Sequence, residues 1–468
     1  MKRLLTLFAC AVTLFTACTK DDGGTKVRTY SVSVRLVYPD DGTLTAAEGV
    51  EVRMTNSSSG TVVQAATDAQ GVASFLLPEG IYEAAASDRR SVEGYTYTLN
   101  ALQSNVVVSA STWSEGMTVD LKLVASRAGQ ILIKEIYSGG CQKDDGSGTY
   151  QFDKYMVICN NSDQRAEIRN FCVGMTGPYN ANAAINNYVD GKLYYADAGY
   201  TPSICAFWYL PKELVLDPWA SATIVLCGAI DHTTTYANSV DLSHADYCTY
   251  DPEVFTNTSY YPAPSESIPS ENYFKATFYG KGNAWPVSVF GPGLFIFSTG
   301  DNDPHAWGQS TDNRYYFPGK ENNEVYACAK IPNEWILDAV EIYGSNYVSQ
   351  SLPRFSTGLD AGYAVLTNFQ GYSIYRNVDK EATEALAGNE GKIVYGYSLG
   401  TTDYKGAQST DPSGIDAEAS IRNGAHIVYS DTNNSSNDFQ LRGVASVNAS
   451  KGPLVIIDGI PGGDMRAL

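Results

Sequence analysis

Histidine is scarce in this sequence, and its scarcity narrows the chemistry that the chain can perform. Only four occur in 468 residues, namely His232, His244, His305 and His426. Histidine is the usual acid–base group at neutral pH, so few side chains are suited to proton transfer. A P-loop, a Ser-x-x-Lys pair and a dinucleotide-binding glycine motif after a strand are also missing from the sequence. We therefore expect a protein that is not an enzyme.

A hydrolase is the enzymatic alternative that stays open, because acidic residues are abundant. Asp and Glu total 51, and a glycoside hydrolase needs two facing carboxyl groups whose separation a sequence does not reveal. A metal-dependent hydrolase is the other form of this alternative. Gly396 to Gly400 spell Gly-x-Ser-x-Gly around Ser398. The residues that follow favour a loop, whereas a nucleophile elbow needs a helix there.

The sequence also has few basic residues and few long apolar runs. Lys and Arg total 32, which leaves a formal net charge of −19. Nucleic acids and anionic lipid surfaces both attract basic faces, so we expect no nucleic-acid partner. Beyond residue 17 no apolar run approaches the roughly 18 residues of a membrane-spanning helix.

The N-terminus resembles the signal of a bacterial lipoprotein. Lys2 and Arg3 precede an apolar run over residues 4–14, and small residues lead to Cys18. We expect residues 1–17 to be a signal peptide and Cys18 to be acylated, with an ordinary cleaved signal peptide and a chance cysteine as the alternative. Residues 18–28 would then form a lipidated, flexible tether.

The residues after Cys18 indicate the cellular location of the protein. Lys20, Asp21 and Asp22 resemble the export signal that sends Bacteroidota lipoproteins to the outer cell surface. The resemblance implies an outer-membrane protein that is held by its lipid in the membrane leaflet and faces the cell exterior.

Cysteines beyond the signal follow no metal-binding spacing. Seven remain, and no two are spaced Cys-x-x-Cys, so a zinc site built from cysteines is not expected. They are Cys141, Cys159, Cys172, Cys205, Cys227, Cys248 and Cys328. Disulfides are permitted outside the cytoplasm, but seven is odd, so at least one thiol stays free or pairs externally. Small buried apolar residues are an adequate alternative explanation for several of them.

Residues 29–124 predict a small all-β domain. Residues 30–38 alternate with period two, and residues 67–84 contain two strands with turns at Gly71 and at Pro78 to Gly80. The stretch carries Thr67, Asp68, Gly71, Phe75, Leu77, Pro78, Gly80 and Tyr82. This pattern resembles the carboxypeptidase-regulatory or transthyretin-like (immunoglobulin-like) β-sandwich, whose members are spacers and docking modules.

Residues 128–468 predict a second, larger β domain after a bridge at 125–129. Strands are expected at 130–137, 155–162, 166–174, 219–227, 283–290, 293–297, 330–341 and 437–442. A short helix is expected over 381–387, with Gly388 as its stop. Lys134-Glu135 and the segment from Tyr155 to Asn160 resemble the lamin-tail-type β-sandwich. The expected fold is therefore all-β, with two sandwich domains, long loops and few short helices.

Taken together, these features resemble an uncharacterised family of Bacteroidota surface lipoproteins, domain of unknown function 4876. Its members combine a transthyretin-like domain with a lamin-tail-like domain, and the family has no assigned activity. The resemblance implies a companion of a TonB-dependent outer-membrane receptor that assists nutrient uptake.

Aromatic residues in the long loops are the candidate ligand-binding residues. The chain has 33 Tyr and 6 Trp, and such rings offer an apolar face with a polar tip. We expect a binding face for an unknown small ligand within residues 229–328, formed by Tyr260, Tyr261, Trp285, Trp307, Tyr315 and Tyr316. The alternative is that these rings lie in cores and strand pairs.

Metal sites are weaker candidates, and no other cofactor is expected. Asp231, His232, His244 and Asp246 lie close in sequence and offer nitrogen and oxygen ligands for a divalent ion. Residues 143–148 and 301–305 resemble calcium loops, although neither has the twelve-residue EF-hand register. Turns and helix caps use the same residue types.

These observations favour a surface-exposed, non-catalytic lipoprotein that binds a ligand or docks on a TonB-dependent transporter. A structural or adhesive surface protein is the main alternative, and a hydrolase is the less favoured one.

Overall fold

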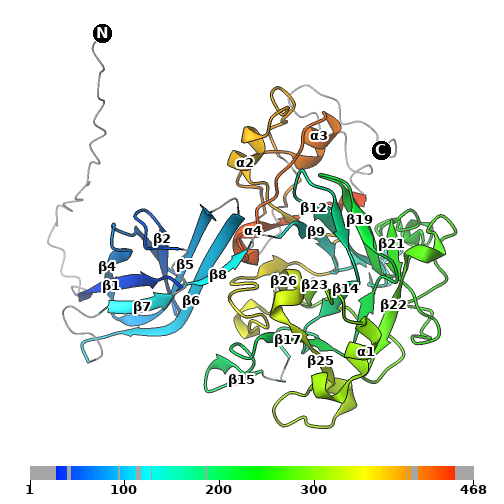
Figure 1. The fold of residues 1–468 in the computed structure, drawn as a ribbon, viewed down its shortest axis with the longest axis horizontal. Helices are drawn as coiled ribbons and strands as arrows, with labels where there is room; N and C mark the ends of the chain where they lie inside the picture. The colour runs from blue at the N-terminus through cyan, green and yellow to red at the C-terminus, as the bar shows by residue number, and fades with distance from the viewer. Residues whose placement is uncertain are drawn as a thin grey trace.

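The computed structural model has a small and a large β domain (Figure 1). Alternating apolar residues build its two largest hydrophobic cores, one in each domain. The structure describes residues 28–39, 44–92, 95–111, 118–127, 129–183, 185, 187–397, 399–401 and 409–447. Cys18, Lys20, Asp21, Asp22 and Ser398 lie outside these residues. Within these ranges, no helix is long and apolar enough to cross a membrane.

The small domain is a sandwich of two sheets. In one sheet, the central strand β1 pairs antiparallel with β4 and parallel with β7; the other sheet has the order β3-β2-β5-β6-β8. The strands are β1 (Thr29–Val37), β2 (Glu51–Asn56), β3 (Val62–Ala66), β4 (Val72–Pro78), β5 (Gly80–Val92), β6 (Tyr95–Val108), β7 (Thr118–Lys122) and β8 (Val124–Arg127). Val32, Val34 and Phe75 are among the side chains that fill the space between the sheets.

The transthyretin-like motif spans both sheets. The two strands expected from it are present as β4 and β5, and Gly71 has the positive φ of +73° that its turn requires. However, β4 pairs with β1 whereas β5 pairs with β2 and β6. The turn at Pro78 to Gly80 therefore carries the chain from one sheet to the other. The expected bridge at 125–129 is also corrected, because residues 124–127 form β8 at the edge of the small domain.

The large domain is organised around a twelve-stranded sheet among the described residues. In spatial order its strands are β27 (Ala364–Leu366), β26 (Ile336–Gly344), β23 (Gly293–Ser298), β14 (Phe171–Met175), β18 (Ala206–Tyr209), β22 (Tyr273–Phe278), β21 (Tyr247–Thr249), β20 (Ser221–Cys227), β12 (Lys154–Asn160), β9 (Ile131–Tyr137), β28 (Ser373–Arg376) and β29 (Phe439–Arg442). The strand pairs β26–β27, β20–β21 and β21–β22 are parallel. All other neighbours pair antiparallel, including β9 and β28, whose pairing is short.

This sheet bends until its two halves face each other. The backbone N–H of Ile133 on β9 donates to the Asp338 carboxylate on β26 at 2.6 Å, and β27 contacts β29. Side chains from both halves, such as Ile158, Trp208 and Leu294, meet in one core. The expected all-β class with sandwich-like domains is confirmed.

Shorter elements extend this framework. The minor strands are β10 (Cys141–Gln142), β11 (Thr149–Tyr150), β13 (Ala166–Ile168), β15 (Tyr188–Val189), β16 (Lys192–Leu193), β17 (Tyr200–Ile204), β19 (Leu214–Leu216), β24 (Arg314–Tyr315) and β25 (Cys328–Pro332). The helices are α1 (Pro304–Gln309), α2 (Lys380–Ala385), α3 (Ala417–Arg422) and α4 (Ser435–Asp438). The expected helix after Asp379 is confirmed as α2, which the Asp379 carboxylate caps through the Ala382 N–H at 3.0 Å.

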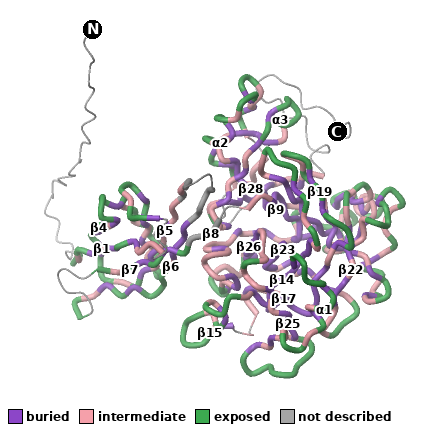
Figure 2. The backbone as a smooth tube through the Cα atoms, viewed as in Figure 1, coloured by how far each residue is buried: buried purple, intermediate pink, exposed green. Residues whose placement is uncertain are grey.

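Loops cover the outer face of the central strands, so these strands are buried on both sides (Figure 2). Met156 and Ile158 of β12 face the main core. On the other side, Tyr155 and Val157 pack under residues of the 229–268 loop, and Cys159 packs beside α3. This two-sided burial explains why β9 and β12 are almost continuously apolar.

One expected strand is absent. Residues 283–290 do not form a strand, and the chain there is irregular. Trp285 and Val287 are nevertheless buried in the main core. Apolar side chains at alternate positions suggested a strand, but they anchor a loop, and Pro286 removes a backbone donor between them.

Candidate functional site

Three of the expected ligand-binding rings are part of the protein core. Tyr261, Trp285 and Tyr315 have exposed fractions of 4%, 0% and 5%. The indole Nε1 of Trp285 donates to the carbonyl of Ile204 at 3.2 Å, and the Tyr261 hydroxyl donates to the carbonyl of Trp285 at 3.3 Å. Their assignment to an exposed binding face is therefore wrong. A large ring with a polar tip suits a ligand contact. The same features also suit a core position, because the polar tip of a buried Trp or Tyr usually hydrogen-bonds within the protein.

The other three candidate rings are half-buried, and each has different neighbours. Trp307 packs on Trp335 with ring centroids 4.4 Å apart, and its Nε1 donates to the Lys330 carbonyl at 2.9 Å. Tyr260 packs on the main core, and Tyr316 follows β24. Residues 229–328 thus do not gather these aromatic rings into one face.

His232 is a structural residue and not a free metal ligand. It lies in a 3₁₀ turn over His232–Thr234 and is 2% exposed. Its Nε2 is 2.6 Å from the Gly228 carbonyl oxygen, and its Nδ1 is 2.9 Å from the Tyr150 hydroxyl. Because a carbonyl only accepts, Nε2 carries the proton and Nδ1 accepts from Tyr150. Burial lowers the pKa of His232, which keeps the ring neutral. Both nitrogens are occupied, so this candidate is wrong.

The remaining metal candidates serve turns and caps. Asp231 accepts from the Thr233 N–H at 2.9 Å, Asp246 accepts from the Thr223 N–H at 2.7 Å, and His244 is exposed. In the calcium-like loops, Asp145 accepts from the Ser147 N–H and Asp303 caps α1. Across the described residues, no group of three or more acidic, histidine or cysteine side chains is placed to hold a metal ion.

All seven cysteines beyond residue 140 are buried and unpaired with one another. Burial raises the pKa of the Cys141 thiol to about 12, so it is neutral at physiological pH. A thiol with so high a pKa is a poor nucleophile. The cysteines therefore act as small apolar core residues, as the alternative explanation held.

A cleft that none of these candidates anticipated lies where four loops converge. Its volume is about 410 Å³, within the usual range of small-ligand pockets. It is lined by Cys141, Gln142, Ala237, Asn238, Phe369, Gln370, Gly371, Gly443, Val444 and Ala445. We call it the Phe369 cleft. None of these side chains is charged.

Backbone hydrogen bonds hold the Phe369 wall against the β9–β10 loop. The Phe369 N–H donates to the Gly139 carbonyl at 2.9 Å, and the Gly371 N–H donates to the Gly140 carbonyl at 3.0 Å. Phe369 has a φ of +58°, a left-handed conformation that is costly for a bulky residue. An edge-on contact with Phe290, at 5.9 Å between ring centroids, helps to keep it there.

Two buried carboxylates hold the other walls to the central strands. Asp153, next to β12, accepts from the Ser239 hydroxyl at 2.6 Å and lies 3.9 Å from the Cys141 sulfur. Glu135 on β9 accepts from the Ser446 N–H at 3.0 Å and from the Ser446 hydroxyl. Burial raises the pKa of both carboxyl groups. They lie behind the walls, so they position the loops and leave the cleft lining uncharged.

Sequence reasoning missed this cleft because its residues come from four distant segments. The only local signals are the Gly139-Gly140 pair and Gly371, where Gly140 and Gly371 have positive φ. A Cβ on Gly140 would lie 2.2 Å from the Tyr150 carbonyl oxygen. Such glycines mark close backbone approach, but they do not say which loops meet.

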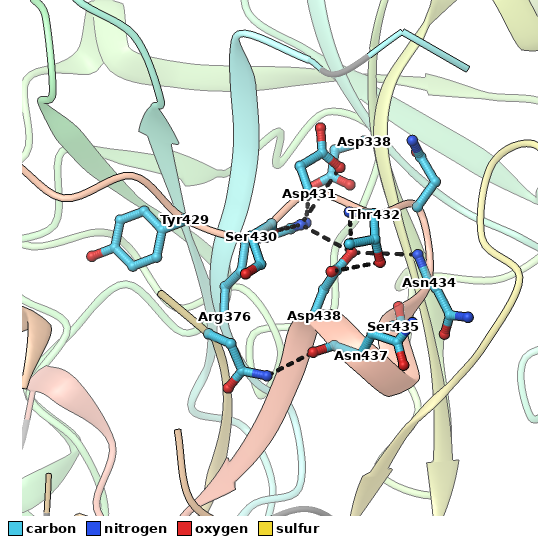
Figure 3. A network of polar contacts seen from close by, with 12 residues as sticks. Asp338, Arg376, Tyr429, Ser430, Asp431, Thr432, Asn434, Ser435, Asn437 and Asp438 are labelled. Atoms are coloured by element: carbon cyan, nitrogen blue, oxygen red, sulfur yellow. Dashed lines mark hydrogen bonds and ion pairs between the residues drawn. The ribbon is translucent and has the colours of Figure 1, made fainter. Parts of the chain in front are cut away.

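Several charged side chains of the large domain form ion pairs in its interior. The Arg376 guanidinium is 1% exposed and donates to the Ile133 carbonyl at 2.7 Å. It also donates to the Ser430 carbonyl at 2.9 Å and to the Asp338 carboxylate (Figure 3). Asp431 and Asp438 lie 3.8 and 3.7 Å from it. This network fixes residues 430–438 to β9 and β26, so we assign it a structural role.

Comparison with known proteins finds similarity to one protein family. Residues 217–395 match the family model described as "Protein of unknown function (DUF4876)". This segment of the chain is therefore a DUF4876 region. The crystal structure of a DUF4876 family protein from Bacteroides thetaiotaomicron VPI-5482 is similar at 20% identity and a TM-score of 0.50. The match covers 88% of this chain and 95% of that chain, so the two share a fold across both domains.

Other comparisons add little. A DUF3823 family protein from Parabacteroides merdae matches at 10% identity, covering 40% of this chain and 91% of that one, with a TM-score of 0.14. The major pilin subunit of Bacillus cereus matches at 13% identity, covering 68% of this chain and 95% of that one, with a TM-score of 0.15. Scores this low carry no argument about fold or function. No curated protein sequence matches the chain.

Proposed function

We propose that this DUF4876 protein is a lipid-anchored, outward-facing outer-membrane protein that binds a small ligand in the Phe369 cleft and delivers it to a TonB-dependent receptor without catalysing a reaction. The observation that carries this proposal is the cleft itself. It is of ligand size, and its walls are tied to β9 and β12 through Glu135 and Asp153. Loops anchored in this way are preorganised, which lowers the entropy cost of binding.

The chemistry around the cleft supports binding and not catalysis. Cys141, the one titratable side chain in its lining, has a pKa of about 12. Asp153 and Glu135 are 0% exposed, and they hold the cleft walls by accepting hydrogen bonds from Ser239 and Ser446. General acid–base catalysis needs a titratable group within hydrogen-bond reach of the ligand. The lining offers amides, apolar groups and backbone instead.

The small domain supports a docking role. Ile81 and Val107 face each other on β5 and β6, and they are 47% and 43% exposed. Apolar side chains on an outer sheet face suit contact with another protein. In the sequence, the domain also lies between the anchor expected at Cys18 and the residues of the cleft, the order that a spacer would have.

Ligand binding is tested with the chain from residue 23, which retains both folded domains. Thermal-shift screens against glycans, peptides, haem, siderophores and divalent metals report binding, because a ligand at a hundredfold excess over its Kd stabilises the fold by about 2.7 kcal/mol. Ala237 is exposed and lines the cleft. Ala237→Trp should fill the cleft and abolish the shift, whereas Ala237→Ser should preserve it. A shift that survives Ala237→Trp contradicts the cleft as the binding site.

The transport role is tested in cells. Ala237→Trp should slow growth on the limiting nutrient, and Ala237→Ser should not. Normal growth with the filled cleft, together with attachment of cells to a matrix through the same protein, would favour the adhesive alternative.

A further inference from the structure

The Phe369 cleft is uncharged in a strongly acidic protein. Acidic residues outnumber basic ones by 51 to 32 in the whole chain, yet no lining residue carries a charge. An ionic ligand would lose its hydration there without gaining a charged partner. The buried carboxylates Asp153 and Glu135, which hold two of the walls, accept hydrogen bonds from Ser239 and Ser446. The lining therefore selects against anions and cations.

Three carboxamide side chains from three segments supply the polar part of the lining. Gln142, Asn238 and Gln370 are all exposed at the cleft. The side-chain Nδ2 of Asn238 donates to the backbone carbonyl of Gln142 at 3.1 Å. The side chains of Gln142 and Gln370 make no hydrogen bond to any described residue. A carboxamide both donates and accepts. A hydroxyl group does the same, so ligand hydroxyls match these side chains.

Phe369 supplies the apolar part. Its ring is half-buried, lies beside the carboxamides in the lining and is backed by Phe290. An aromatic face next to hydrogen-bonding side chains suits a ligand with one apolar face and a polar rim. A sugar ring has this combination, with C–H groups on its face and hydroxyls around its edge.

We infer that the Phe369 cleft binds a neutral, polyhydroxylated ligand, namely a small uncharged saccharide. This inference rests on the proposed function and adds the ligand class. Gln142, Asn238 and Gln370 hydrogen-bond the hydroxyls, and the Phe369 ring packs against a sugar face. The absence of charged side chains from the lining rejects acidic sugars.

Calorimetric titration of the chain from residue 23 tests the ligand class. The probes are glucose, galactose, mannose, lactose, maltose and cellobiose, with glucuronate and galacturonate as charged counterparts and triglycine amide as a peptide. At least one neutral sugar should bind saturably, and the uronates should bind at least tenfold more weakly. Gln142→Ala with Gln370→Ala should weaken that binding by about tenfold, the effect of losing two net hydrogen bonds. The matched control is Gln350→Ala, at an exposed glutamine outside the lining.

The outcomes separate the two proposals. Binding of the peptide or of a uronate that Ala237→Trp abolishes overturns the saccharide class and keeps the cleft as a ligand site. If none of the neutral sugars binds in the titration, the saccharide class is overturned as well. If a ligand from the wider thermal-shift screen binds equally well to Ala237→Trp, the cleft function fails as well.

Discussion

The Arg442 guanidinium and the Glu418 carboxylate form a two-pronged pair in the interior of the large domain. Nη1 of Arg442 donates to Oε1 of Glu418 at 2.8 Å, and Nη2 donates to Oε2. Arg442 is 0% exposed, and its Cζ lies 4.7 Å from the centre of the Tyr375 ring. The pair ties α3 to β29, the last strand before one wall of the Phe369 cleft.

Removing the charge of Glu418 should destabilise the protein strongly. Glu418→Gln removes the counter-charge that is hydrogen-bonded to the buried Arg442 guanidinium, and breaking a buried pair in this way typically costs about 3–5 kcal/mol. Denaturant unfolding followed by tryptophan fluorescence measures the loss. The matched control is Glu390→Gln, at an exposed position. Equal stability of the two variants would show that Arg442 has another partner.

Stability should fall as the pH rises from about 4 to about 7, through the buried Asp360 carboxyl. Burial raises its pKa to about 7, against a usual value of 3.8. Across this window the folded state holds a proton that the unfolded state has lost, so the free energy of unfolding decreases with pH. One such group contributes a slope of up to about 1.4 kcal/mol per pH unit. Glu418 acts in the opposite direction, because its partner Arg442 lowers its pKa to about 2. Its contribution is lost as the pH falls from about 4.5 towards 2.

Denaturant unfolding at pH 4, 5, 6 and 7 measures the slope. Asp360→Asn should make the decrease with pH smaller, whereas Asp197→Asn, at an exposed position, should leave it unchanged. An unchanged slope in Asp360→Asn would assign the effect to another group, such as Asp438, whose pKa burial also raises to about 7.

The junction between the domains should depend on Asn100. Its Nδ2 on β6 donates to the carbonyl of Thr432 and, at 3.3 Å, to that of Asn433. Asn100→Ala should cost about 1–3 kcal/mol through these two bonds and speed amide hydrogen exchange near residues 432–434. Gln103→Ala, an exposed change on the same strand, is the control. If both variants exchange alike, the domains are held together by other contacts.

Trp285 should behave as a core residue. Trp285→Ala removes a fully buried ring and is expected to cost about 3–5 kcal/mol of stability. Trp307→Ala, at a half-buried ring, should cost less. Thermal unfolding of both variants gives the comparison. A Trp285 variant of native stability would reopen its assignment as a ligand contact.

Acylation at Cys18 should control membrane attachment. Cys18→Ala should abolish incorporation of labelled fatty acid, because the thiol is the acceptor in the predicted lipoprotein signal, and Cys10→Ala should not. Replacing Lys20, Asp21 and Asp22 with alanine should preserve acylation but remove sensitivity of intact cells to added protease. Full labelling of Cys18→Ala would favour the ordinary signal peptide instead.

The sequence by itself determined the elements whose signals are local. Alternation over residues 30–38 and the apolar runs at Ile131 and Met156 predicted strands, because burial on one or two faces imposes those patterns on neighbouring residues. Asp379 predicted the start of α2 because a helix cap acts within one turn. The all-β class followed from the same short-range patterns.

Only the tertiary structure decided what depends on distant residues. It placed β4 and β5 in different sheets, buried Trp285, satisfied both nitrogens of His232 and brought Gln142, Asn238, Phe369 and Val444 to one cleft. The physical reason is that a side chain carries the same local pattern whether its partner is solvent, a ligand or a residue 200 positions away. Burial and partnership arise only when the whole sheet closes.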